Sequence, residues 1–180
     1  MNKELDLIKT PAIRALVENC LKRVPEYFWT MPASTTGKYH PAYTLGEGGL
    51  VRHTKAAVWI ANELLRLDMF KRIAVMSDEI YAALILHDTV KKGMDGSAYT
   101  TTDHPLQASE LVQRVANDTC CDHPSVRTIR RLIETHMGQW TTDFDGNEVL
   151  PKPKSPEQSF VHLCDYLASR KLLTVELDNV

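Results

Sequence analysis

The sequence predicts an all-α domain, and three observations lead to that prediction. Apolar residues recur at steps of three and four along most of the chain, which is the period of an amphipathic helix. Segments rich in glycine and proline separate these stretches, and almost none of the 180 residues reads as a sustained strand. The composition, 43% apolar and 24% charged, is that of an ordinary globular domain. We therefore expect a single helical bundle over residues 1–180, with an N-terminal helical region at 1–31 and a motif-bearing core at 32–171.

Six helices are expected, and they begin, in chain order, at Pro11, Leu50, Ser77 as N-cap, Asp103, His123–Pro124 and Ser155. The first helix stops at Pro25, and the second ends near Leu67. Residues 26–49 read as a long connection, because prolines and glycines interrupt them. Residues 138–155 read as an irregular loop, in which Asp145–Gly146 could turn a small hairpin.

The charge balance and the cysteines argue against several classes of protein. The 21 basic and 23 acidic side chains leave a net charge of −2, which disfavours a long nucleic acid as partner but leaves room for a local basic rim. No apolar run is long enough for a membrane helix and no signal-peptide core is found, so no membrane partner is expected. The four cysteines include no C-x-x-C pair, which indicates a reduced, cytoplasmic protein. Zinc at Cys120, Cys121 and His123 is a minor alternative, because the spacing matches no standard finger.

Several polar residues fall on helix faces that the apolar pattern would bury. They are, in chain order, His53 on the second helix, His87 with Asp88 on the third, His136 on the fifth and Asp165 on the last. A single buried histidine is usually an ordinary core residue. A set of them together with carboxylates needs a shared partner, since an unpaired buried carboxylate costs several kcal/mol. A metal centre would supply that partner.

The order of these residues is that of a known family. The chain reads Gly48-Gly49-Leu50-Val51-Arg52-His53, then Leu86-His87-Asp88-Thr89-Val90-Lys91, then His104, His136 and Asp165. This pattern, over roughly residues 32–171, resembles the HD-domain metal-dependent phosphohydrolases, whose signature is a His, a His-Asp pair, further His residues and a distal Asp on helices of one bundle. The resemblance implies an HD-domain helical bundle and makes these residues the expected metal ligands.

A closer resemblance is to the two-metal branch, and in particular to the HD domain of bacterial 3′–5′ exoribonucleases. It rests on Gly48-Gly49-Leu50, on Tyr99-Thr100-Thr101 before His104, and on Ser155-Pro156-Glu157 with His162 and Asp165. This resemblance implies that His53, His87, Asp88 and Asp165 hold a first metal, and that Asp88 bridges to a second held by His104 and His136. The chain departs from the pattern at Met137, where some members have a second histidine. His162 could replace that ligand or take a supporting role.

The ligand types imply the chemistry. Imidazoles and carboxylates without thiolate favour one or two ions of Fe, Mn, Zn, Ni or Co. Such ions lower the pKa of water toward about 7 and create a hydroxide that attacks phosphorus. The expected catalytic residues are Asp88 and Lys91; on a helix Lys91 would lie on the side of Asp88 and neutralise phosphoryl charge, unless it is an ordinary solvated lysine.

The leading functional prediction is a phosphohydrolase, of phosphodiesterase or nucleotidase type, that acts on a small phosphorylated substrate such as a nucleotide or short oligonucleotide. One alternative is 3′–5′ exonuclease-like activity on RNA or DNA. Another, from a different class, is a non-catalytic, metal-containing module that senses nucleotides. Assembly as a homo-oligomer is left open.

Six residues are predicted to contact the substrate: Lys38, His40, Arg52, Gln139, Trp140 and Arg170. Lys38 and His40 belong to the polar segment 34–40, which is equally an ordinary loop. Arg52 adjoins His53 and either reaches a phosphate or lies on the surface. Trp140 either stacks on a nucleobase or anchors the core or a lid. Arg170 follows Asp165 by about one turn, where it would complete an anion-binding rim.

Overall fold

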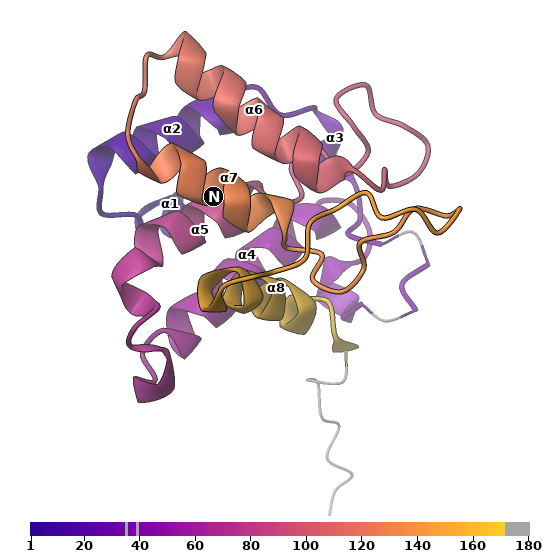
Figure 1. Ribbon diagram of the computed structural model, residues 1–180. Coiled ribbons are helices and arrows are strands. Elements are labelled where there is room, and N and C mark those ends of the chain that lie inside the picture. The colour runs from indigo at the N-terminus through magenta and orange to yellow at the C-terminus, as the bar shows by residue number, and fades with distance from the viewer. Residues whose placement is uncertain (35, 39, 172–180) are drawn as a thin grey trace, which may run out of the picture.

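The computed structural model describes residues 1–34, 36–38 and 40–171, and this part of the chain contains helices but no strand (Figure 1). Its eight α-helices are α1 Asn2–Leu5, α2 Pro11–Leu21, α3 Tyr27–Thr30, α4 Gly49–Leu64, α5 Ser77–Leu86, α6 His104–Asp118, α7 Ser125–Glu134 and α8 Pro156–Ala168. Three short 3-10 turns are η1 Ala42–Thr44, η2 Asp68–Phe70 and η3 Ala74–Met76. The predicted all-α helical bundle is confirmed. No helix in the described ranges is long and apolar enough to cross a bilayer.

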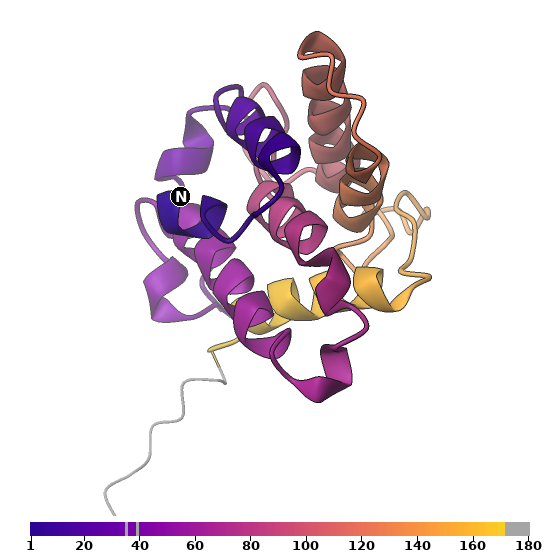
Figure 2. The same cartoon turned by 90° about the vertical axis from the view of Figure 1, so that its left-hand side faces the viewer.

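Helix α5 forms the centre of the bundle. It packs against α2, α4, α7 and α8, and Figure 2 shows it between α4 on one side and the α6–α7 pair on the other. Every residue of Ile80–Leu86 is buried. The sequence predicted one buried face for this helix, but a helix that is surrounded by others is apolar all round. His87 and Asp88 follow it directly, so the chain leaves the core with both side chains still buried.

Helices α6 and α7 form an antiparallel pair joined by the short segment 119–124. His104 opens α6 and His136 follows the end of α7, so the pair brings these two histidines to the same end. Figure 1 shows that the loop after α5, the loop after α7 and the connection before α4 all lie at that end of the bundle. Helix α8 packs on α4 and reaches the same region with its C-terminal half.

Several boundaries differ from the expected ones. The connection 26–49 contains the short helix α3 and the turn η1, and the second helix ends at Leu64 rather than near Leu67. Ser77 is the first residue of α5 and makes no capping hydrogen bond. Ser155 does cap α8: its Oγ accepts the backbone N–H of Gln158, whose side chain accepts the N–H of Ser155. The capping box therefore fixes the start of the helix that carries Asp165.

The loop 138–155 is irregular, as predicted, and contains a small hairpin-like turn. An isolated antiparallel bridge joins Thr142 to Glu148. Asp143 holds the turn, since its Oδ1 accepts the backbone N–H groups of Asp145 and Asn147 at 3.0 and 2.8 Å. These hydrogen bonds from backbone to side chain stabilise the turn locally, where a regular hairpin would rely on pairing between two strands.

Gly49, the first residue of α4, packs directly against backbone. A Cβ atom at this position would lie 2.0 Å from the carbonyl oxygen of Thr44. Only glycine allows the preceding connection to cross so closely over the start of the helix. This contact sets the position of α4, and with it the position of His53 one turn later.

Candidate metal centre

Six predicted ligands meet at one end of the bundle and form the cluster that we call the His/Asp cluster: His53, His87, Asp88, His104, His136 and Asp165. His53 comes from α4, the adjacent His87 and Asp88 from the turn after α5, and the others from α6, the turn after α7, and α8. The first five are at most 2% exposed, whereas the side chain of Asp165 is 18% exposed. The cluster is therefore buried but open on the side of α8.

Asp88 lies in the middle of the cluster and faces imidazoles with both of its oxygens. Its Oδ1 is 3.2 Å from Nε2 of His104 and 3.8 Å from Nε2 of His136. Its Oδ2 is 3.5 Å from Nε2 of His87 and 3.8 Å from Nε2 of His53. One carboxylate thus serves two different pairs of histidines.

Asp165 also faces the second pair, His53 and His87. Its Oδ1 is 2.9 Å from Nε2 of His53 and 3.5 Å from Nε2 of His87. Neither of these two Nε2 atoms has a hydrogen-bond partner. Atoms that approach in this way without bonding to one another are arranged like ligands of a common centre.

Backbone carbonyls fix the tautomers of three histidines. Nδ1 of His87 lies 2.7 Å from the carbonyl oxygen of Leu84, and Nδ1 of His104 lies 2.7 Å from that of Thr101. Nδ1 of His136 lies 2.8 Å from the carbonyl oxygen three residues earlier in the same way. A carbonyl oxygen only accepts, so each Nδ1 carries the proton. In the neutral ring Nε2 then presents a lone pair to the centre of the cluster, as a metal-binding histidine does.

Burial and neighbouring charges shift the pKa values of the cluster residues in different directions. Burial, followed by the neighbouring His87 and His104, lowers the pKa of His136 to about 3. Burial also lowers the pKa of His87, but attraction to Asp88 and Asp165 outweighs it and the net shift is upward. Burial raises the pKa of Asp88, but Lys91 and His87 overcome it and hold the pKa well below the usual range. Asp165 is likewise held ionised, since its contacts with His53 and His87 outweigh burial.

These donor atoms fit a divalent metal. Nε2 of His104 and Nε2 of His136 lie 3.2 Å apart with both lone pairs facing inward, so a hydrogen bond between the neutral rings is excluded. Both ring nitrogens of His53 and Nε2 of His87 are buried without a hydrogen-bond partner. Each orphaned polar atom costs about 1–3 kcal/mol, and a cation at the centre would satisfy Nε2 of His53 and Nε2 of His87 together. Imidazole and carboxylate donors suit Fe, Mn, Zn, Ni or Co.

The ligand atoms divide into groups that a single ion could contact. One group is His53, His87 and Asp88, and another is Asp88, His104 and His136; they share only Asp88. A third group joins His87, His136 and Asp165. Within each group the ligand atoms lie within 4.8 Å of one another. The arrangement has room for one or for two ions.

Lys91 reaches Asp88 through a turn rather than along a helix. Helix α5 ends at Leu86, and residues 87–96 form successive turns. The expected helical spacing is therefore wrong, but the contact exists: Nζ of Lys91 donates to Oδ2 of Asp88 at 2.6 Å. The side chain of Lys91 is 16% exposed, so the ammonium group lies between the buried carboxylate and the solvent.

A cavity of about 210 Å³ opens over the His/Asp cluster, and we call it the site cavity. Lys91 lines it together with His40, Trp140 and Arg170, three of the residues predicted to contact the substrate. Nδ1 of His40 is buried there without a hydrogen-bond partner, 6.1 Å separating the ring centroids of His40 and His53. Burial, and then Lys91 and His53, lower the pKa of His40 to about 4, so its ring is neutral.

The other three predicted substrate contacts are not brought to the site cavity. Lys38 and Gln139 are exposed and do not line it. Arg52 points its guanidinium group to the preceding connection, where Nε donates to the carbonyl of Tyr43 and an Nη donates to that of Leu45 at 2.9 Å. In this structure Arg52 therefore holds the segment around Tyr43 and Leu45 against the start of α4.

Tyr166 and Ser169 line the site cavity but did not emerge from the sequence. Tyr166 directly follows Asp165 on α8, and Ser169 is the residue that follows the last residue of the helix. A signal was present in the four-residue spacing of His162, Tyr166 and Arg170, which places these polar and aromatic side chains on one helix face. This spacing does not indicate a substrate contact until the structure shows that the helix borders the site.

His162 supports the cluster from behind. Its Nδ1 donates to the backbone carbonyl of His136 at 2.7 Å, and its ring packs on Gly138. Since the ligand groups found in the described residues do not include His162, replacement of a missing ligand by this residue is not supported. Met137 itself lines the site cavity, where a thioether is a weak ligand for these ions.

Gly138 has both a left-handed backbone and no room for a side chain. Its φ is +64°, and a Cβ atom would lie 2.4 Å from the ring of His162. We expect Gly138→Ala to lower the free energy of unfolding by about 3 kcal/mol and to weaken metal binding, because His162 must release the carbonyl of His136. Gly146→Ala is the control, since φ is +86° there but nothing lies within 4 Å. Urea unfolding and metal titration test this, and equal losses for the two variants would contradict it.

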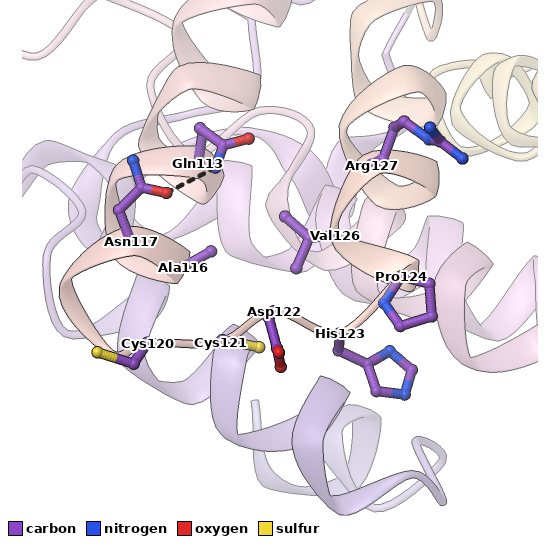
Figure 3. Close-up of a pocket in the computed structure, with 10 residues that line it drawn as sticks. All are labelled: Gln113, Ala116, Asn117, Cys120, Cys121, Asp122, His123, Pro124, Val126 and Arg127. Carbon is purple, nitrogen blue, oxygen red and sulfur yellow. Dashed lines mark hydrogen bonds between the residues drawn. The ribbon is translucent and has the colours of Figure 1, made fainter.

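A second hollow lies at the opposite end of the α6–α7 pair, around the segment 119–124. Figure 3 shows that the thiols of Cys120 and Cys121 point in different directions there. Nδ1 of His123 accepts the backbone N–H of Ser125 at 3.3 Å and so contributes to the start of α7. Among the described residues, the groups of side chains that could hold a metal ion do not include Cys120, Cys121 or His123. The minor zinc alternative at this place is not supported.

Comparison with known proteins agrees with the geometry. The family model described as HD domain matches residues 50–170, which is more than half of the chain and includes the whole His/Asp cluster. No curated protein and no solved structure matches significantly. HD domains bind divalent metals and are in general hydrolases, and the buried cluster of histidines and aspartates meets that description. The chain therefore belongs to the HD domain family.

Proposed function

We propose that this protein is a metal-dependent phosphohydrolase that cleaves a phosphate ester of a nucleotide or of a short oligonucleotide. The observation that carries the proposal is the position of Asp88. Its two oxygens face two pairs of imidazoles, and its Oδ2 also accepts from Lys91 at the edge of the site cavity. A buried set of metal-ligand atoms with a cation beside an open cavity is suited to binding and cleaving an anionic ester.

In this proposal His53, His87, Asp88 and Asp165 hold a first ion, and Asp88, His104 and His136 hold a second. When bound, such ions polarise a phosphoryl oxygen and lower the pKa of a water molecule. The three carbonyls that bind Nδ1 of His87, His104 and His136 keep each Nε2 unprotonated and correctly oriented. Met137 reduces the ligand count of the second position, so its occupancy is part of what must be measured.

Lys91 and His40 are the residues that would contact the reacting phosphate. Lys91 carries its positive charge at the border between Asp88 and the site cavity, where it would offset the charge of a phosphoryl group. The unbonded Nδ1 of His40 lies in the same cavity and would bind a phosphate or sugar oxygen. The cavity of about 210 Å³ is smaller than one that encloses a whole ligand, so part of the substrate would lie outside it.

The net charge of −2 supports a short substrate over a long nucleic acid. Exonuclease-like removal of terminal nucleotides is the second candidate, because the branch of HD domains that this chain resembles has that activity and because an open cavity accepts a chain end. The non-catalytic sensing module remains the alternative from another class, and it predicts binding without turnover.

The decisive experiment combines elemental analysis of the purified protein with a substrate panel. The panel contains nucleotides, cyclic dinucleotides, model phosphodiesters and short RNA, each with added Mn, Fe, Ni or Co. We expect a transition metal in the purified protein and turnover of at least one nucleotide substrate. Metal without turnover of any ester would favour the sensing module, and the absence of any metal affinity would overturn the proposal.

Lys91→Ala is expected to lower kcat by about 100-fold while the metal content stays the same, because it removes the cation beside the phosphoryl group and no metal ligand. Lys91→Arg should recover part of the rate, since it keeps the charge. The matched control is Lys92→Ala, because the neighbouring side chain does not line the site cavity. Steady-state kinetics and elemental analysis measure both effects, and an unchanged kcat would remove Lys91 from the mechanism.

A further inference from the structure

One wall of the site cavity is aromatic. Trp140 stacks on Tyr166 with an angle of 14° between the rings and 5.8 Å between the centroids. The guanidinium carbon of Arg170 lies 4.3 Å from the centroid of the same tyrosine ring. All three side chains line the site cavity, and we call them the aromatic platform.

The aromatic platform is attached to the His/Asp cluster at two points. Tyr166 follows the ligand Asp165 directly on α8, and Trp140 follows the ligand His136 by four residues. His162 ties these two segments together, since it bonds to the carbonyl of His136 and contacts the ring of Trp140 at 5.7 Å between centroids. A group bound on the platform would therefore lie at a fixed place relative to a phosphate at the cluster.

The chemistry of the platform matches a flat, aromatic group next to an anion. Trp140 is 44% exposed, although it borders a buried site, so the residue remains accessible to a ligand beside its stack on Tyr166. Indole and phenol rings stack on nucleobases, and a guanidinium group adds a cation that is compatible with both a π-face and a phosphate. A sugar phosphate without a base has no aromatic face to stack on these rings.

We propose that the aromatic platform is a nucleobase subsite, which selects phosphate esters that carry a base over those that carry only a sugar. This rests on the proposed function, since it assigns the substrate class of the same site. Trp140 supplies the stacking surface, Tyr166 holds it in place, and Arg170 lies at the border between base and phosphate. The platform offers stacking rather than base-edge recognition, so the preference is for a base and not for one particular base.

The test compares binding of AMP with binding of ribose 5-phosphate, two ligands that differ only in the base. Calorimetry on the full chain gives both dissociation constants, and quenching of tryptophan fluorescence gives a second readout; neither depends on turnover. We expect AMP to bind about tenfold more tightly than ribose 5-phosphate. Similar affinities for the two ligands would overturn the subsite.

Variants show whether the preference arises at the platform. Trp140→Leu should weaken AMP binding about tenfold and leave ribose 5-phosphate binding unchanged, whereas Trp140→Phe should keep most of the preference. Phe144→Leu is the matched control, because Phe144 lies on the same loop and is 95% exposed but does not line the site cavity. Equal weakening of both ligands by Trp140→Leu, or of neither, would overturn the subsite.

The outcomes also separate the subsite from the proposed function. If AMP is preferred and Trp140→Leu removes the preference, but no ester is hydrolysed, the subsite stands and the phosphohydrolase does not. If esters with and without a base are hydrolysed equally well and bind equally well, the phosphohydrolase stands and the subsite is wrong. Thermal unfolding of each variant verifies that the changes in affinity arise in a folded protein.

Discussion

Asp88→Asn is expected to remove the bound metal and to lower turnover by about a thousandfold or more. The reason is that Asp88 alone faces all four histidines of the cluster, with one oxygen for each pair. The amide of asparagine offers only one oxygen, which is neutral and a weaker metal ligand than a carboxylate. Its NH₂ group would face either the unprotonated Nε2 atoms of the histidines, which need a cation, or the ammonium group of Lys91. Because asparagine has nearly the same volume, the variant should still fold.

Elemental analysis, turnover and thermal unfolding of Asp88→Asn test this expectation together. Asp145→Asn is the control, since it makes the same change in an exposed turn away from the site cavity. A variant that keeps its metal would show that the cluster does not depend on the central carboxylate. A variant that loses metal but keeps its turnover would show that the metal is not part of the reaction.

The sequence predicted the helices well where their pattern reflects burial on one face. The stripe of α2 and that of α7 follow the period of 3.6 residues, and the proline and serine at the start of α8 mark its first turn. The central helix α5 was described less well, because a helix that is buried all round has no polar face to reveal its orientation. The short α3 was missed, since four residues carry too little periodic signal.

The candidate ligands could be found because a buried polar residue stands out against an apolar stripe. This argument identified His53, His87, Asp88, His136 and Asp165, whereas His104 came only from the order of motifs in a known family. The structure brings all six together, although His87 and His136 lie just beyond the ends of their helices rather than within them. The prediction from residue spacing survives this difference, because the exact end of a helix is uncertain by one or two residues.

The surroundings of the cluster could not be predicted, because they depend on contacts between distant segments. His162 bonds to a carbonyl 26 residues away, and Arg52 is used by the connection before α4 rather than by a substrate. Tyr166 gains its position only when the loop after α7 places Trp140 on it. Contacts between distant segments leave no periodic pattern in the sequence. The residue type alone is therefore compatible with several roles for each of these side chains.

Removal of the metal with a chelator is expected to lower the free energy of unfolding by about 4 kcal/mol, if the free metal was a thousandfold above its dissociation constant. The apparent Tm should fall by roughly 10 °C for a domain of this size. The physical reason is that a cation which binds only the folded cluster stabilises it by mass action, and that it satisfies the orphaned Nε2 atoms of His53 and His87. Asp88→Asn, which is expected to bind no metal, should show no response to the chelator.

The size of this metal-dependent stabilisation should decrease as the pH falls, because protons and metal compete for the same nitrogen. The pKa of His87 is raised above its ordinary value of 6.5, so the competition begins above pH 6.5, whereas His136, with a pKa of about 3, stays unprotonated throughout. In the metal-free protein the raised pKa of His87 acts in the opposite direction: its contribution is present below pH 6.5 and is lost as the pH rises through the folded-state pKa. The difference in stability between the protein with metal and the protein without it should therefore grow as the pH rises above 6.5, and a constant difference would show that His87 does not bind the metal.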